Sequence, residues 1–243
     1  MKTYFLAIYW IGISAFIPTD ASGNAFADSV TTRFTTRLNS MGMFNYGGRL
    51  VSSNPAIDFM YVREGRNLSV SAFKAFDLYD VHTDNNFTAV FLYRNFNVAK
   101  RFVVTPSLGF VAPQLHSIAD KGSDFAARLA FSYKLLPHLT LEHTSIITNI
   151  ALDTEYRDWV NRLRLTYSKK SIDVSLTVWH NNNALDNSSY LTTAVNLAYA
   201  RIRVSNHLLM STGITSVIMP YSDDRELNPK KNGLVMTVAA VIH

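Results

Sequence analysis

Apolar and polar residues alternate along most of this chain beyond residue 28. Between residues 123 and 134, Phe125, Leu129 and Tyr133 share one parity, whereas Arg128 and Lys134 share the other. Because successive side chains of a β-strand point to opposite faces, such a segment is a strand with one apolar and one polar face. The same alternation recurs at residues 157–168 and 171–181. The pattern predicts an all-β fold.

Strands of this kind follow one another along the whole chain after residue 28. Twelve are expected, at residues 29–40, 55–63, 67–78, 86–97, 101–112, 123–134, 138–148, 157–168, 171–181, 189–201, 207–218 and 233–242. The connections at 64–66, 98–100, 135–137, 169–170 and 202–206 are short, and those at 41–54, 79–85, 113–122, 149–156, 182–188 and 219–232 are longer and polar. A tilted strand needs about nine to eleven residues to cross a bilayer, and most of these strands are that long.

A sheet that crosses a membrane has to close on itself. Hydrocarbon offers no water to the backbone groups at a free edge, so each unpaired group there costs several kcal/mol. We therefore expect residues 28–243 to form one domain, a closed antiparallel up-and-down transmembrane β-barrel of twelve strands. In this architecture the chain resembles the bacterial outer-membrane β-barrel proteins. The resemblance implies integral outer-membrane localisation, contact with outer-membrane lipids and insertion by the barrel-assembly machinery. An even strand number places both termini on the short-turn side, expected to be periplasmic.

The first 27 residues are expected to be a cleaved signal peptide. Lys2 precedes an apolar run from Tyr4 to Ile17, and this run is too short to span a bilayer as a helix. Ala25-Phe26-Ala27 has the small-x-small form that signal peptidase accepts, and Ala21-Ser22-Gly23 is a second possible cleavage site. An N-terminal membrane anchor is the alternative interpretation.

Composition narrows the class further. The chain has 243 residues, of which 48% are hydrophobic and 17% charged, which excludes intrinsic disorder. It has no cysteine, which excludes disulfides and thiolate metal sites. The seven histidines lack the spacing of a zinc site, so we expect no metal cofactor. The net charge of +5 is dispersed along the chain, and we expect no nucleic-acid partner.

The inward-facing positions of the predicted barrel carry more basic than acidic residues. The expected lumen-lining charged residues are Arg33, Arg37, Arg128, Lys134, Glu142, Arg162, Arg164 and Asp173. One interpretation is a narrow pore or solute-binding barrel that favours a small anionic solute. The other is a charge network that plugs the interior and holds the barrel together, since inward charges are common in such barrels.

Aromatic residues near the strand ends suit the membrane–water interfaces, where hydrocarbon meets headgroups. The residues assigned to these girdles are Phe91, Tyr93, Phe96, Phe102, Tyr133, Trp159, Tyr167, Tyr190 and Tyr199. Trp179 has lumen parity, so it either fills space inside the barrel or marks a shift of register.

One set of polar residues has a parity that faces lipid. His143 and Ser145 share the parity of Leu141, and Asn161 shares the parity of Leu163 on the next strand. If these strands pair about residue 152, Asn161 lies opposite His143. Ser145 would then be a nucleophile, His143 its base and Asn161 the group that orients the imidazole.

This arrangement resembles outer-membrane phospholipase A, a twelve-stranded barrel with a His-x-Ser on one strand and a Trp-Asn-Arg-Leu stretch on the next. The resemblance is confined to residues 142–165 and implies lipid hydrolysis at the outer face, with calcium as cofactor. Asp153, Glu155 and Asp158 are the candidate calcium ligands.

Three functions therefore remain open: a pore or solute-binding barrel, a phospholipase-type serine esterase, and a structural surface barrel whose function lies in loops 41–54 and 219–232. The sequence does not say whether the barrel forms oligomers.

Overall fold

The computed structural model describes residues 30–44, 48–79, 86–112, 124–151, 157–183, 187–224 and 231–243. The predicted signal peptide, residues 1–27, lies outside the described residues. Within the described part of the chain, no helix has the length and apolar character needed to cross a bilayer.

The described residues form the following strands: β1 (Thr31–Asn39), β2 (Gly42–Phe44), β3 (Arg49–Ser52), β4 (Ala56–Glu64), β5 (Ser69–Asp77), β6 (Phe87–Tyr93), β7 (Phe96–Ala99), β8 (Phe102–Ala112), β9 (Asp124–Leu136), β10 (Leu139–Ile147), β11 (Trp159–Lys169), β12 (Ile172–Asn183), β13 (Ser188–Arg203), β14 (Leu208–Ser222) and β15 (Gly233–Ile242). Each predicted strand is present, with its ends displaced by a few residues. The strand predicted at 86–97 is divided into β6 and β7.

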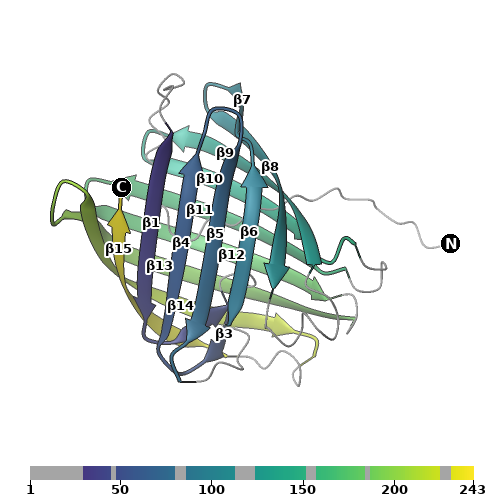
Figure 1. Ribbon diagram of the computed structural model, residues 1–243. Coiled ribbons are helices and arrows are strands. Elements are labelled where there is room, and N and C mark those ends of the chain that lie inside the picture. Colours follow the sequence, from purple (N-terminus) through teal and green to yellow (C-terminus); the bar gives the residue numbers. More distant parts are fainter. Residues whose placement is uncertain are drawn as a thin grey trace.

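The strands close into a barrel (Figure 1). β1 pairs antiparallel with β4 on one side and with β15 on the other. The other strands follow in chain order, and the pairing of β6 with β8 completes the ring, while β7 pairs with β8 beyond the end of β6. With β6 and β7 counted as one strand, the predicted closed antiparallel barrel of twelve strands is confirmed. Among the described residues, every wall strand except the short β7 pairs on both sides, so closure leaves almost no free edge there.

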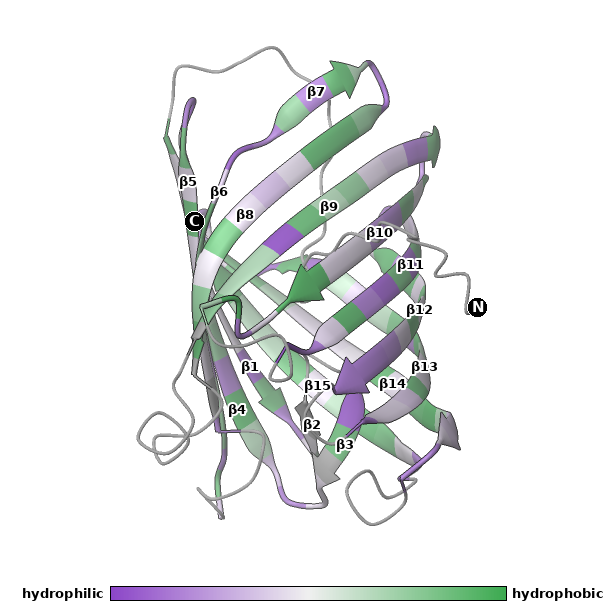
Figure 2. Ribbon diagram, turned by 90° about the vertical axis from the view of Figure 1, so that its right-hand side faces the viewer, coloured by the Kyte–Doolittle hydropathy of each residue, from purple (hydrophilic) through white to green (hydrophobic). Residues whose placement is uncertain are grey.

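The alternation of the sequence is realised as an apolar outer face and an inner face that carries the charges. On β12, Ile172, Val174 and Leu176 are 49%, 37% and 43% exposed on the outside, whereas Asp173 and Ser175 line the lumen. Figure 2 shows this as apolar and polar bands that alternate along the strands. The exposed apolar residues of neighbouring strands form a continuous belt, which is the surface that a lipid bilayer covers.

The two ends of the barrel differ. We call one the short-turn end, because β4–β5, β7–β8, β9–β10, β11–β12 and β13–β14 are joined there by residues 65–68, 100–101, 137–138, 170–171 and 204–207. The opposite end is the long-loop end. Because β1 begins and β15 ends at the short-turn end, Val30 and His243 both lie there (Figure 1).

Three of the predicted long loops contain more strand than expected, and one of them is 219–232, into which β14 runs as far as Ser222. β12 runs to Asn183 and β13 begins at Ser188, so the predicted loop at 182–188 is shorter than its prediction. Asn183 Nδ2 donates a hydrogen bond to Ser188 Oγ at 3.4 Å, which extends the hairpin with polar residues. The predicted loop at 41–54 contains the hairpin of β2 and β3, and β3 contacts β14.

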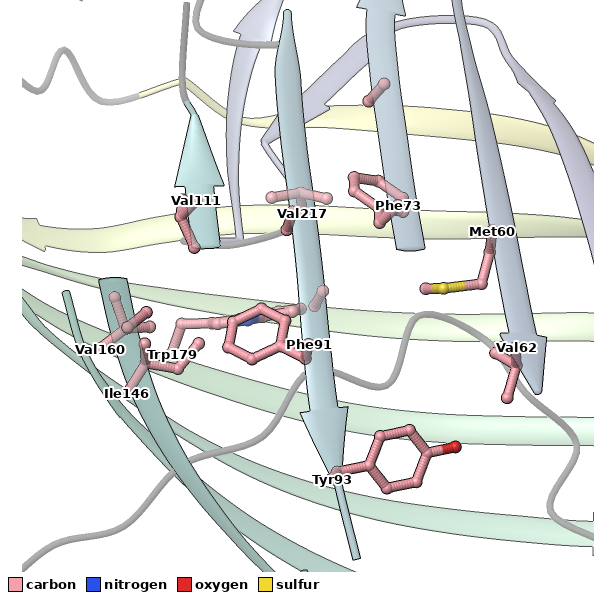
Figure 3. Packing of buried hydrophobic residues seen from close by; sticks show 14 of the residues in the cluster. Met60, Val62, Phe73, Phe91, Tyr93, Val111, Ile146, Val160, Trp179 and Val217 are labelled. Atoms are coloured by element: carbon pink, nitrogen blue, oxygen red, sulfur yellow. The ribbon is translucent and has the colours of Figure 1, made fainter. Parts of the chain in front are cut away.

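The lumen also contains an apolar section, which the prediction of a polar, mostly basic lumen did not include. Buried apolar residues form one cluster inside the barrel (Figure 3). We call this cluster the septum. Its members are Leu50, Met60, Val62, Phe73, Ala75, Ala89, Phe91, Tyr93, Val111, Ala126, Ile146, Val160, Trp179, Ala194, Val217 and Val235. On β8 to β15 they lie in the half of each strand nearest the long-loop end, and on β4 to β6 they extend further toward the short-turn end.

Three aromatic residues that were assigned to the membrane interfaces lie inside the barrel instead. Phe91, Tyr93 and Tyr190 are 1%, 8% and 3% exposed, because they point into the barrel rather than to the membrane interfaces. Trp179 is 6% exposed and fills space inside, so its register does not slip. Of the remaining girdle residues, Phe96, Tyr133, Trp159, Tyr167 and Tyr199 are exposed on the outside, and Phe102 is half-buried.

A candidate solute cavity in the lumen

A cavity of about 520 Å³ lies in the lumen. Its lining includes Arg201, Ser211 and His243 near the short-turn end, and Arg37 and Thr144 at mid-height. Met60, Phe73 and Phe91 of the septum line its wall as well. The cavity therefore lies between the short-turn end and the septum, and its size is that of a site for a small organic solute.

Most of the charged residues predicted for the lumen lie around this cavity. The residues that line it from that set are Arg33, Arg37, Arg128, Glu142, Arg164 and Asp173. Arg162 is buried on β11 and interacts electrostatically with Glu142, Arg164 and Arg128. Lys134 is half-buried on β9 at the parity of Arg128 and lies nearer the short-turn end, outside the cavity lining.

Three ion pairs hold part of this charge in place. Arg37 Nε donates to Asp58 Oδ1 at 2.6 Å, and both residues are buried directly opposite each other on β1 and β4. On the far wall, Arg164 Nη1 lies 3.8 Å from Glu142 Oε2 on the adjacent strand. Because the lumen is narrow and partly apolar, these pairs interact more strongly than exposed pairs would.

The third pair depends on a strand irregularity that sequence parity does not predict. Arg201 follows the outward-facing parity of Tyr199, but it has a φ of 60° and lies where the pairing of β13 with β14 shifts register between Tyr199 and Ile202. Its guanidinium donates hydrogen bonds to both carboxylate oxygens of Asp173, with Nη1–Oδ2 and Nη2–Oδ1 distances of 3.2 and 3.0 Å. Arg201 also donates to the carbonyl of Lys170. A bulge thus brings into the cavity a cation that the sequence analysis missed.

Arg128 contacts both polar and aromatic residues of the lumen. Its Nε donates to Ser107 Oγ at 2.9 Å, and its guanidinium lies over the rings of Phe91 and Tyr93, at 4.9 and 5.7 Å from their centroids. Tyr93 in turn donates its hydroxyl hydrogen to Glu64 Oε1 at 3.3 Å. Cation–π contacts of this kind fix a guanidinium without neutralising its charge.

The cavity has a surplus of positive charge. Among the described residues that line it, five arginines face three acidic side chains; they are Arg33, Arg37, Arg128, Arg164 and Arg201, and Glu64, Glu142 and Asp173. Glu64 and the buried Asp58 were not predicted as lumen residues, although both share the inward parity of Met60 and Val62 on β4. A low-dielectric wall strengthens the field of such a surplus.

The polar residues predicted on the lipid face pair differently from the expected arrangement. Asn161 lies opposite Ser145, and His143 lies opposite Leu163, so the predicted pairing of Asn161 with His143 is wrong by two residues. Ser145, 2% exposed, donates its hydroxyl hydrogen to Asn161 Oδ1. The imidazole of His143 stacks on Phe131, with 6.3 Å between ring centroids.

This contact pattern differs from that of a catalytic triad. In a triad the nucleophile's hydroxyl donates to the imidazole and the third group holds the imidazole. Here the hydroxyl of Ser145 is hydrogen bonded to the amide of Asn161. Of the candidate calcium ligands, Asp153 and Glu155 lie outside the described residues.

The barrel is similar to solved porin structures. The KdgM porin superposes with a TM-score of 0.58 at 8% identity, covering 87% of this chain and 98% of that chain. The KdgM porin solved in complex with disordered oligogalacturonate gives a TM-score of 0.56 at 8% identity, covering 87% of this chain and 98% of that chain. The NanC porin gives 0.53 at 11% identity, covering 88% of this chain and 100% of that chain. No protein-family model matches the sequence, and neither does any curated protein. The chain therefore has the fold of the bacterial outer-membrane porins, with the apolar outer belt that an integral barrel requires.

Proposed function

We propose that this chain is a porin-type barrel of the outer membrane that binds small anionic solutes in its lumen and passes them across. The observation that carries the proposal is the excess of arginine over acidic side chains around the cavity. Guanidinium groups present several N–H donors in a plane, which suits carboxylate oxygens. The cavity is wide enough for one or two sugar rings or a comparable organic acid.

The proposal includes an orientation. Barrels of this kind carry short turns on the periplasmic side and longer loops outside. Val30 and His243 both lie at the short-turn end, so the two termini would be periplasmic, and the charged cavity would open toward the periplasm. Insertion by the barrel-assembly machinery remains a prediction from the resemblance to the outer-membrane barrel class.

An acidic saccharide is the solute class that we favour. The KdgM porin, which shares this fold, has been solved with oligogalacturonate. A sugar acid carries carboxylates for Arg33, Arg128 and Arg164, and its ring has apolar faces for the aromatic wall of the cavity. Binding measurements with an acidic and a neutral saccharide test this choice.

We expect the detergent-solubilised barrel to bind trigalacturonate and to bind neutral maltotriose much more weakly. Changing Arg128 or Arg164 to glutamine should lower the affinity for trigalacturonate by about tenfold each, because each change removes charge-assisted hydrogen bonds. Isothermal titration calorimetry measures both, and affinity should fall as salt is raised.

The control for this experiment is Arg63→Gln. Arg63 is exposed on β4 and faces outward at the short-turn end, so its loss removes the same charge without touching the cavity. Equal binding of the acidic and the neutral trisaccharide, or equal losses in Arg63→Gln and Arg128→Gln, would contradict an anion site in the lumen.

The esterase hypothesis gains no support from the structure or from the comparisons, and we do not propose it. Ser145 is covered and hydrogen bonded to Asn161, which fits a structural contact between β10 and β11. A surface function of loops 41–54 and 219–232 remains a prediction; residues 45–47 and 225–230 of these loops lie outside the described residues.

A further inference from the structure

The septum takes members from almost the whole circumference of the barrel. Among the described residues, every strand of the barrel wall except β1 and β7 contributes to it, from Met60 on β4 to Val235 on β15. Figure 3 shows members from opposite walls, with Phe73 and Phe91 on one side and Ile146, Val160 and Trp179 on the other. Because the buried members belong to one hydrophobic cluster, neighbouring members exclude water from between them.

Burial shows that this level of the lumen is dry. Val217, Ile146 and Val235 are 0%, 2% and 2% exposed, although each faces the interior of the barrel and none lines the cavity. Wall residues of a water-filled pore would remain accessible to water from the inside. The lumen of this barrel is therefore open at the arginine-lined cavity and apolar beyond it.

The hairpin of β2 and β3 completes the septum from within. Leu50 on β3 is 3% exposed and belongs to the cluster. A Cβ atom at Gly48 would lie 2.2 Å from Trp179 Cδ2, and one at Gly233 would lie 2.5 Å from Leu50 Cδ1. The hairpin backbone at Gly48 therefore packs against Trp179 of β12, and Leu50 packs against Gly233 at the start of β15. A larger residue at either glycine would clash with its neighbour.

We propose that the septum is a hydrophobic gate, which keeps the barrel closed to water and ions until a solute displaces it. An ion that enters a dry apolar section loses its hydration and gains no polar partner, so such a section blocks ions even where its radius would admit them. The gate extends the proposed function: the cavity would hold an anion on one side of the septum, and the septum would decide whether it passes.

Two buried polar atoms, one in the septum and one directly beside it, lack hydrogen-bond partners among the described residues. Trp179 Nε1 and Thr192 Oγ1 belong to directly paired residues of β12 and β13, and neither has a hydrogen-bond partner among the described residues. Buried donors of this kind are normally satisfied, so they destabilise the closed arrangement. An open, hydrated septum would satisfy both atoms, which makes opening less costly.

The test distinguishes the effect of hydrating the septum from the effect of widening it. Valine is exchanged for threonine, which has almost the same shape but carries a hydroxyl group. The inner variant carries Val160→Thr, Val217→Thr and Val235→Thr, all three within the septum. The matched outer variant carries Val174→Thr, Val195→Thr and Val238→Thr, which are 37%, 49% and 47% exposed on the lipid face. Phe91→Ala serves as a third variant, in which the passage is widened.

Planar-bilayer recordings of the purified full chain in KCl give the result. We expect little steady current from the wild-type protein and the outer variant, and a rise of about tenfold or more in the inner variant, because hydroxyl groups let the septum hydrate. A wild-type current equal to that of the inner variant overturns the gate. So does a current that appears only in Phe91→Ala, because this means a steric plug.

The same recordings test the gate and the proposed function separately. Under a KCl gradient, the reversal potential of the inner variant should be displaced from zero toward the chloride equilibrium potential. A rise in current without chloride preference would contradict the anionic function and leave the gate intact. Binding of trigalacturonate together with an ungated wild-type current would contradict the gate alone. Electrophoretic mobility before and after heating verifies that each variant folds, and Val217→Thr alone replaces the inner variant if the triple change does not fold.

Discussion

Replacing Asp58 with alanine is expected to lower the free energy of unfolding of the barrel by about 3–5 kcal/mol. The carboxylate of Asp58 accepts hydrogen bonds from Arg37 Nε at 2.6 Å and from Asn39 Nδ2 at 3.0 Å. Asp58 and Arg37 are only 1% and 4% exposed. Loss of the carboxylate leaves the Arg37 guanidinium buried without its counter-charge. Equilibrium unfolding in urea, with the barrel refolded into lipid vesicles, measures the change.

Two further variants show whether the buried charge is the cause. Asn39→Ala removes one hydrogen bond to Asp58 and no charge, so it should cost about 1 kcal/mol. The double variant Arg37→Leu with Asp58→Leu removes both charges and should recover most of the stability that Asp58→Ala loses. If Asp58→Ala is no more destabilising than Asn39→Ala, the ion pair does not contribute in the way that we describe.

Leu176→Arg is expected to destabilise the barrel by about 2–4 kcal/mol, because it places a charge at mid-height in the lipid-facing belt. Leu176 is 43% exposed on β12 and lies between Leu165 of β11 and Val195 of β13. Unfolding in urea again gives the value. Ser132→Arg is the control, because Ser132 is half-buried and lines the cavity beside Glu142. Similar costs for the two changes would mean that the outer face is not covered by lipid.

The strands could be predicted from the sequence because their two faces differ so clearly. On β12, Ile172, Val174 and Leu176 alternate with Asp173 and Ser175, and this order alone determines which face meets lipid. The number of strands then follows from the loops, and closure follows from the need to pair every backbone group. None of these steps requires a knowledge of tertiary contacts.

The septum could not be predicted in the same way, because both faces of some strands are apolar. On β6, Phe91 and Tyr93 face inward while Val90 and Leu92 face outward, and hydrophobicity does not distinguish the two sets. Aromatic residues near a strand end therefore suggested a membrane interface. Only tertiary information, such as burial and the contact of the Arg128 guanidinium on β9 with the Phe91 ring, shows that the rings lie inside.

Pairing between strands was the other limit. The predicted centre of the loop near residue 152 set Asn161 against His143, but the observed register sets it against Ser145. A shift of two residues keeps every side chain on its face, so alternation cannot detect it. The bulge at Arg201 is a second case, since a local change of register turned a residue of outward parity into the partner of Asp173.

Cysteine scanning of residues 172–178 on β12 tests the central claim most directly, since the chain has no cysteine of its own. Each position is changed to cysteine in turn, labelled with a fluorophore in the vesicle-embedded barrel, and exposed to a quencher attached to lipid acyl chains and to aqueous iodide. We predict strong quenching by the lipid quencher at Ile172, Val174, Leu176 and Val178 and weak quenching at Asp173, Ser175 and Thr177, with iodide reaching Asp173 through the cavity. Quenching without this alternation, or with the lipid quencher reaching the opposite set, would contradict a lipid-covered barrel with a charged cavity inside.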